Sequence, residues 1–158
     1  MLDTGFSRRG HAPTVDRAVP ARRVGDARPE PLRIGLLNNM PDAAFRQTEI
    51  QFRRLIGANV EIQLFSFADV PRSEPVRQDI AARYRSHHAL QDAGLDGLVI
   101  TGCEPKADRL DDEPFFKPLS DVVDWASRGT LSTLFSCLAS HAAVLHRDGI
   151  ERRRLAEK

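Results

Sequence analysis

From Pro31 onward, short apolar segments alternate with longer segments of helical pattern, and no other feature of the sequence limits the fold as strongly. The apolar segments, which predict strands, are residues 32–40 with the loop that ends them, 60–67, 95–102 and 131–137. The segments compatible with helices are residues 43–57, 73–94, 115–129 and 138–149. Strands that alternate with helices across short connections are typical of βαβ units around a parallel sheet. The chain is therefore predicted to form an α/β fold.

Polar, small or reactive residues stand where three of the predicted strands end. These groups are Asn38–Pro41, Thr101–Glu104 and Ser136–Leu138. The carboxyl ends of parallel strands lie at the same edge of a sheet, and ligands bind there. We therefore expect the three groups to meet in one crevice.

Residues 1–31 differ from the rest of the chain. They are rich in Arg, Pro and Ala and have few large apolar side chains. Such a segment buries too little apolar surface to offset its chain entropy, so it is predicted to be a mobile tail that precedes a folded part, residues 32–158. Acidic residues among its arginines argue against a transit peptide or an anionic-surface contact: Asp3, Asp16, Asp26 and Glu30.

Composition argues against several classes of partner and cofactor. A net charge of +1 gives no reason to expect nucleic acid, and no apolar run is long enough for a membrane span. The N-terminus lacks the apolar core of a signal peptide, so a cytoplasmic protein is expected. The two cysteines are not spaced like a metal site, and no phosphate-binding glycine motif is present. We expect no metal and no nucleotide cofactor.

Cys137 follows a predicted strand and precedes a predicted helix. The amides at a helix N-terminus favour a thiolate and can bind an oxyanion, so Cys137 is a candidate nucleophile. Free cysteine is also among the most buried and inert residue types, and position alone favours that second interpretation. Cys103, at another strand end, is better explained as structural.

No histidine in the chain is a convincing general base for Cys137. His141 lies four residues later on the same predicted helix, a placement that rarely lets a base reach the thiol. His87 and His88 are expected to be solvated helix residues. The charged segment 103–114 is expected to be a solvated loop whose beginning could also contact a substrate.

Four strings taken together resemble the homoserine O-succinyltransferase and O-acetyltransferase family. They are "RIGLLNNMPDAAFRQTEIQFRRLIG", "LDGLVITGCEP", "EPFFKPLSDVVDWA" and "STLFSCLASHAAVLHRDGIERRRLAEK". That family shows an N-x-M-P loop before a T-E helix, a D-G-L-I-x-T-G strand and S-T-L-x-x-C at its nucleophile. The resemblance runs from about Arg33 to the last residue.

The resemblance implies a doubly wound, mostly parallel α/β fold similar to the class I glutamine amidotransferases. It also implies acyl transfer from succinyl-CoA or acetyl-CoA to the hydroxyl of L-homoserine, in methionine biosynthesis. Cys137 would carry the acyl group as a thioester, with the Leu138 amide in the oxyanion site. Acyl-CoA would be a co-substrate, no further cofactor is implied, and a homodimer is compatible with the family.

Two lysines take expected roles from the resemblance alone. Lys158 matches a substrate-binding lysine of the family. Lys106 falls where glycine accompanies succinyl transfer and glutamate accompanies acetyl transfer. A cation there would favour the free carboxylate of a succinyl group.

Members of the family continue into a second half that supplies the base histidine, its glutamate partner and an arginine for the amino-acid carboxylate. We therefore expect the chain to be an N-terminal portion, to have little activity alone, and to expose sheet surface that is otherwise covered. Two alternatives stay open. One is an inactive fragment or binding module, and the other is a different amidotransferase-like cysteine enzyme.

Overall fold

The computed structural model describes residues 31–68 and 70–153 of the chain. The predicted mobile tail lies outside the described residues except for Pro31, and Lys158 lies outside them too. All the helices and strands described below fall within the predicted folded part, residues 32–158.

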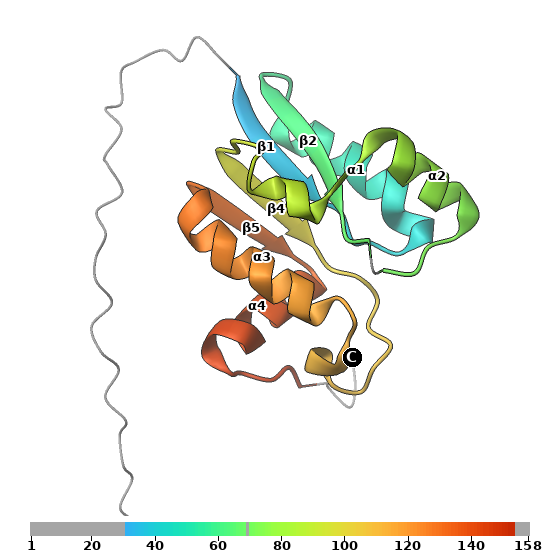
Figure 1. Ribbon diagram of the computed structural model, residues 1–158, viewed down its shortest axis with the longest axis vertical. Helices are drawn as coiled ribbons and strands as arrows, with labels where there is room; N and C mark the ends of the chain where they lie inside the picture. The colour runs from blue at the N-terminus through green and yellow to red at the C-terminus, as the bar shows by residue number, and fades with distance from the viewer. Residues whose placement is uncertain (1–30, 69, 154–158) are drawn as a thin grey trace, which may run out of the picture.

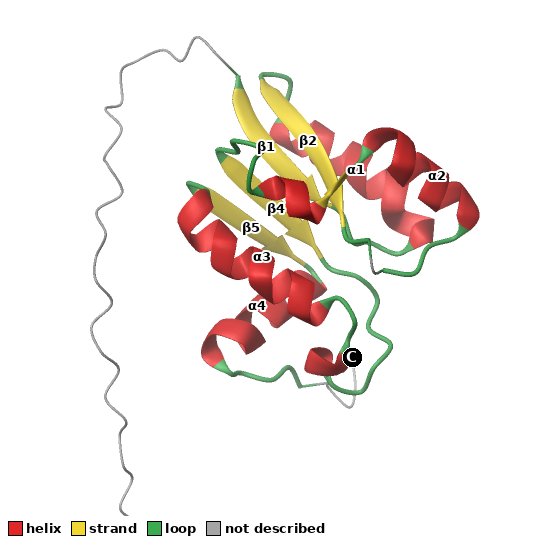
Figure 2. Ribbon diagram, in the orientation of Figure 1, coloured by secondary structure: helices red, strands yellow, loops and turns green. Residues whose placement is uncertain are grey.

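Strands and helices alternate along the described residues (Figure 2). The strands are β1 (Leu32–Leu37), β2 (Val60–Ser66), β3 (Arg85–Ser86), β4 (Gly97–Thr101) and β5 (Ser132–Ser136). The α-helices are α1 (Asp42–Ile56), α2 (Glu74–Arg83), α3 (Phe116–Gly129) and α4 (Leu138–Asp148). Two short 3-10 helices, η1 (His87–Leu90) and η2 (Leu110–Asp112), lie in the connections.

The five strands form one parallel sheet in the order β3-β2-β1-β4-β5. The chain runs outward from β1 through β2 to β3, crosses back to β4 on the other side of β1, and continues to β5. The direction of winding therefore reverses between β1 and β4. In open parallel sheets a ligand crevice forms at the carboxyl ends of the strands at such a switch point. The predicted doubly wound α/β fold is confirmed.

Helices cover both faces of the sheet, with α1 and α2 on one side and α3 on the other (Figure 1). Neighbouring residues of each central strand point to opposite faces, which explains why these strands are apolar throughout. The core under α1 and α2 contains Leu36, Phe45, Leu64, Tyr84 and Val99. The core under α3 and α4 is larger, and its members include Leu37, Phe65, Ile100, Leu119 and Val123.

The end of α4 lies where the sequence predicts it. The helix ends before Gly149, whose φ of 66° is the left-handed conformation common just after helices. The Gly149 amide donates to the carbonyl oxygen of Leu145 at 2.9 Å. Glycine adopts this backbone conformation without the steric cost of a Cβ.

The predicted helix over residues 73–94 is wrong beyond Arg83. There α2 ends, Tyr84 is extended, and the chain enters β3 and η1. The reason is tertiary: Tyr84 is buried against Phe45, with ring centroids 5.0 Å apart, and β3 pairs with β2. His87 is also not a solvated helix residue, because it is buried in η1 edge-on to Phe67. His88 is exposed as expected, but it lies in η1 rather than in an α-helix.

Within the described residues, β5 forms one edge of the sheet. Apolar side chains beside this edge are exposed, Leu134 by 54% and Leu131 by 61%. An edge strand presents unpaired backbone groups to other chain segments. This surface agrees with the expectation of uncovered sheet.

Candidate active site

Three strand ends lie at one edge of the sheet, as the sequence predicts, but the prediction of a single crevice is wrong for Ser136–Leu138, which does not line the cavity at that edge. The backbone amide of Asn39, after β1, donates to the Thr101 hydroxyl at the end of β4, at 2.8 Å. The Asn39 side-chain amide donates to the Thr101 carbonyl oxygen at 3.3 Å. The Gly102 amide, after β4, donates to the Ser136 carbonyl oxygen of β5 at 3.1 Å. The ends of β1, β4 and β5 therefore form one connected surface.

Cys137 stands between β5 and α4 in a conformation that residues other than glycine rarely adopt. Its φ is 58° and its ψ is −133°, and it is the one non-glycine residue with positive φ in the described ranges. Cys137 is also exposed. Ser140 donates to its carbonyl oxygen from both the backbone amide, at 3.1 Å, and the hydroxyl, at 2.6 Å.

A strained strand-to-helix turn that exposes one side chain is the geometry of a nucleophile elbow. The interpretation of Cys137 as a small buried hydrophobe is therefore wrong. The structure places Cys137 at the N-cap position of α4, where helix amides favour negative charge.

The Leu138 amide, the candidate oxyanion donor, lies against Gly102. A Cβ on Gly102 would stand 2.8 Å from the backbone nitrogen of Ala139 and closer still to that of Leu138. Amides in the first turn of a helix lack carbonyl partners within the helix. Because residue 102 is glycine, the end of β4 can pack this closely against the first turn of α4.

Cys103 differs from Cys137 in its surroundings. It is partly buried, and burial, with a further contribution from the charge of Glu113, raises the pKa of its thiol to about 12. A thiol that stays protonated at neutral pH is a poor nucleophile. These properties favour the structural interpretation of Cys103.

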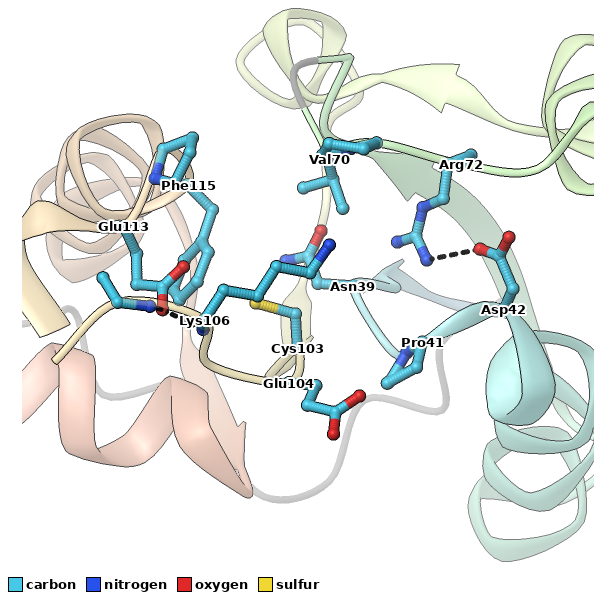
Figure 3. A pocket seen from close by; sticks show the side chains of 13 residues that line it. Asn39, Pro41, Asp42, Val70, Arg72, Cys103, Glu104, Lys106, Glu113 and Phe115 are labelled. Atoms are coloured by element: carbon cyan, nitrogen blue, oxygen red, sulfur yellow. Dashed lines mark hydrogen bonds and ion pairs between the residues drawn. The ribbon is translucent and has the colours of Figure 1, made fainter.

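A cavity of about 530 Å³ lies at the switch point, between the loops that follow β1, β2 and β4 (Figure 3). Its apolar lining includes Pro41, Val70 and Phe115, and its polar lining includes Arg72 and Lys106. Cys103 also lines it, whereas Cys137 lies at the neighbouring strand end and does not. A ligand that fills this cavity must pass the end of β4 to reach Cys137.

Lys106 reaches this cavity from the loop after β4. Its backbone amide and that of Ala107 donate to the same carboxylate oxygen of Glu113, the latter at 2.7 Å. Glu113 is buried, so the prediction of a solvated loop over residues 103–114 is wrong at this position. The buried carboxylate fixes the loop that carries Lys106.

Arg72 is a site residue that sequence reasoning missed. Its guanidinium lines the cavity, donates to the Met40 carbonyl oxygen and to Asp42 (3.2 Å), and lies 4.8 Å from the Phe45 ring centroid. Arg72 is one of many arginines in the chain and stands in a proline-containing connection, where no local pattern distinguishes it. Only the return of this connection to the strand ends brings it into the site.

A buried carboxylate behind the β1 loop belongs to Glu49 of the T-E motif, and the sequence did not indicate its burial or its contacts. Glu49 accepts hydrogen bonds from Arg46, Arg53 and Arg83 at 2.6–2.9 Å, and from the Tyr84 hydroxyl at 3.0 Å. Burial alone raises the pKa of this carboxyl, but the donors outweigh it and lower the pKa to about 2. Glu49 is therefore ionised across the neutral range.

Asn38 connects this carboxylate to the strand ends. Its side-chain amide donates to the Phe45 carbonyl oxygen at 2.9 Å and lies 3.5 Å from the Tyr84 hydroxyl. Its side-chain oxygen accepts from the Met40 amide at 3.2 Å and from the Thr101 hydroxyl at 3.3 Å. The network holds the turn that leads from β1 into α1.

None of the described histidines forms a hydrogen bond with the Cys137 sulfur. His141 is exposed on α4, and His146 pairs with Asp124 at 2.9 Å. In the part of the chain that the structure describes, no hydrogen bond reaches the Cys137 sulfur. The expected base is not found among these residues.

Metal-ligating clusters and membrane-spanning helices are both absent from the described ranges. These ranges contain no group of three or more His, Cys, Asp or Glu side chains arranged to hold a metal ion. None of their helices combines the length and apolar character that crossing a bilayer requires.

Comparison with known proteins identifies the family. A family model described as homoserine O-succinyltransferase matches residues 18–158. The homoserine O-succinyltransferase of Methylorubrum extorquens is 61% identical over 100% of this chain and 49% of its own length. The homoserine O-succinyltransferase of Rhodopseudomonas palustris is 44% identical over 94% of this chain and 44% of its own length. That of Thiothrix nivea is 48% identical over 80% of this chain and 37% of its own length. The chain spans about half the length, or less, of these relatives, and it belongs to the homoserine O-succinyltransferase family.

Proposed function

We propose that this chain carries the acyl-accepting part of a homoserine O-succinyltransferase, with Cys137 as the nucleophile. The observation that supports this most is the exposed cysteine in a strained turn at the N-terminus of α4, next to the Leu138 amide. An exposed thiol beside helix amides is suited to attack on a thioester.

The first step forms an acyl-enzyme. The Cys137 thiolate attacks the thioester carbonyl of succinyl-CoA, and the carbonyl oxygen becomes an oxyanion beside the Leu138 amide. The intermediate then collapses, the bond between the acyl carbon and the CoA sulfur breaks, and CoA leaves as a thiol after taking up a proton. A helix-terminal amide aimed at the developing charge stabilises the transition state more than the ground state.

The second step transfers the acyl group to an acceptor. The hydroxyl of L-homoserine loses its proton to a base and attacks the Cys137 thioester, and the cysteine thiolate leaves. The described residues offer Cys137 no such base, and the relatives are about twice as long as this chain. We therefore assign to this chain the first step, and the complete reaction to a protein of the relatives' length.

Succinyl-CoA is the donor that we propose over acetyl-CoA. The relatives carry succinyltransferase names, and two cations, Arg72 and Lys106, line the cavity. A succinyl group ends in a carboxylate, whereas an acetyl group offers nothing for a cation to bind. Lys106 is accordingly proposed as a residue that selects the acyl group.

Further parts of the proposal rest on the family resemblance. Lys158 is proposed to bind substrate, acyl-CoA to be a co-substrate without any other cofactor, and methionine biosynthesis to be the pathway. A cytoplasmic location is consistent with two cysteines that are both free.

Release of CoA tests the proposal. The chain is mixed with succinyl-CoA without any acceptor, and free CoA thiol is measured over time. We expect a burst that approaches one CoA for each chain and then stops, because the acyl group stays on Cys137. Absence of CoA release with both succinyl-CoA and acetyl-CoA would favour an inactive fragment or a binding module.

A further inference from the structure

Arg72 is a buried cation whose hydrogen-bonding capacity is only partly used. Its side chain is 4% exposed, and one terminal nitrogen, Nη1, donates to the Met40 carbonyl oxygen and to Asp42. Its other two nitrogens, Nε and Nη2, are buried and have no partner among the described residues. Buried donors without a partner cost free energy, so their retention calls for an explanation.

The two free nitrogens lie on one edge of the guanidinium. The Nε–H and one Nη2–H point in nearly the same direction, as a fork that matches the two oxygens of a carboxylate. The partner Asp42 occupies a different nitrogen and leaves this edge vacant. Lysine could not present such a planar pair of donors.

The surroundings of this edge suit an anion at the end of a short apolar chain. Arg72 and Lys106 point toward the same part of the cavity from opposite walls, while Glu104 is turned away from both (Figure 3). The other lining carboxylates already have partners, since Asp42 accepts from Arg72 and the Ser73 amide and Glu113 from the loop amides.

The walls between these charges are apolar, and they include Val70 and Phe115. A cavity of about 530 Å³ holds a small acyl chain easily.

We infer that the Nε–Nη2 edge of Arg72 binds the terminal carboxylate of the acyl group, with Lys106 as the second cation. Arg72 is thus a specificity residue for a dicarboxylic acyl donor. This inference rests on the proposed function, because it assigns one end of the proposed substrate to a place in the cavity. A phosphate of CoA has the same chemistry as a ligand, and the experiment separates the two sources.

The test observes the Arg72 Nε–H directly by NMR of the whole chain with ¹⁵N label. Monomethyl succinate mimics the succinyl thioester with its free carboxylate, and dimethyl succinate has the same chain without charge. We expect the first compound to shift the Arg72 Nε–H resonance downfield to saturation, and the second to leave it unchanged. Equal responses to both compounds would overturn the inference, as would a response to inorganic phosphate or CoA alone.

Variants of Arg72 provide a second test of the inference. Arg72→Gln should weaken binding of monomethyl succinate by about tenfold or more, and Arg72→Lys should fall between Gln and the wild type. Arg54→Gln removes the same charge from an exposed position of α1 and should bind like the wild type. Binding that is unchanged in a folded Arg72→Gln variant contradicts the inference. If that variant does not fold, the resonance of the wild-type chain still decides.

Failure of this inference and failure of the proposed function give different results. If no CoA thioester acylates the chain but monomethyl succinate still binds at Arg72, the proposed function fails and the carboxylate site stands. If succinyl-CoA acylates Cys137 equally well in the wild type and in Arg72→Gln, the function stands and the Arg72 site is wrong.

Discussion

The α-carbon of Gly102 faces the first turn of α4 so closely that a Cβ there would stand 2.5 Å from the backbone nitrogen of Leu138. Real Cβ atoms do not approach backbone that closely, so any side chain at residue 102 must displace the end of β4 or the start of α4. The Leu138 amide is the proposed oxyanion donor. The packing of one glycine therefore controls the geometry of the proposed elbow.

Replacing Gly102 with alanine should damage both stability and acylation. The added methyl group should lower the free energy of unfolding by about 1–3 kcal/mol, as overpacking usually does. Displacement of the Leu138 amide should slow acylation by succinyl-CoA by on the order of 10²-fold. Chemical denaturation and the rate of CoA release measure the two effects.

Gly57→Ala is the matched control, because Gly57 has a positive φ but a Cβ there would meet no atom within 4 Å. It should lose stability through backbone strain and keep its acylation rate. Equal acylation rates in Gly102→Ala and Gly57→Ala would contradict the role given to Gly102.

The two cysteines should differ in their reaction with an alkylating reagent. Cys137 is exposed, while Cys103 is partly buried with its thiol pKa raised to about 12. At pH 8 N-ethylmaleimide should modify Cys137 first. Cys103 should react more than about tenfold more slowly, since only a small fraction of its thiol is ionised. Peptide mapping after timed quenching measures both rates. Faster modification of Cys103 would be incompatible with the described burial.

Stability should depend on Glu49 in a defined pH range. The pKa of Glu49 is lowered from 4.5 to about 2 in the folded chain, so the unfolded chain binds the proton more readily. The stabilisation is complete above pH 4.5 and is lost as the pH falls from there to about 2. Removing the charge should cost about 1–3 kcal/mol near neutral pH, because Arg46, Arg53 and Arg83 lose hydrogen bonds to a carboxylate.

Thermal unfolding of Glu49→Gln at several pH values checks this dependence. The difference in Tm from the wild type should be large at pH 7 and should shrink between pH 4.5 and 2. Glu61→Gln changes an exposed carboxylate on β2 and should show a small difference throughout. A difference for Glu49→Gln that does not vary with pH would show that the carboxylate has no such shift.

Lys106 should influence the choice of acyl donor. Lys106→Glu places a negative charge opposite Arg72 and should lower the ratio of succinyl-CoA to acetyl-CoA acylation rates by about tenfold. The matched control is Lys117→Glu, an exposed lysine on α3 that pairs with Asp121. Competition between the two thioesters measures the ratio by mass spectrometry. An unchanged ratio in Lys106→Glu would remove Lys106 from donor selection.

Much of the fold could be predicted because the periodicity is strong where strands and helices are long. The apolar runs at β1, β2, β4 and β5 form strands, and their carboxyl ends converge as parallel topology requires. β4 is buried throughout, whereas β5 is an edge strand without a buried residue. Residues 84–90 could not be predicted from local pattern. Their sequence is compatible with a continuation of α2. The helix ends at Arg83 because Tyr84 and His87 are buried against residues distant in sequence.

The candidate site, like the fold, could be predicted from the sequence only in part. Cys137 was found because its motif lies in one continuous string, whereas its exposure and strained φ come from the turn that joins β5 to α4. Arg72 and Glu49 act through contacts with residues about thirty positions away. No short motif contains such pairs, so these residues required the tertiary structure.

The central claim is that Cys137 takes the acyl group from succinyl-CoA. The most direct measurement is tandem mass spectrometry of peptides from the chain after incubation with succinyl-CoA and rapid acid quenching. We expect one succinyl group on the peptide that carries Cys137, none on the peptide that carries Cys103, and no acylation in Cys137→Ser under the same conditions. A succinyl group on Cys103 or on lysines alone, with Cys137 unmodified, would contradict the claim.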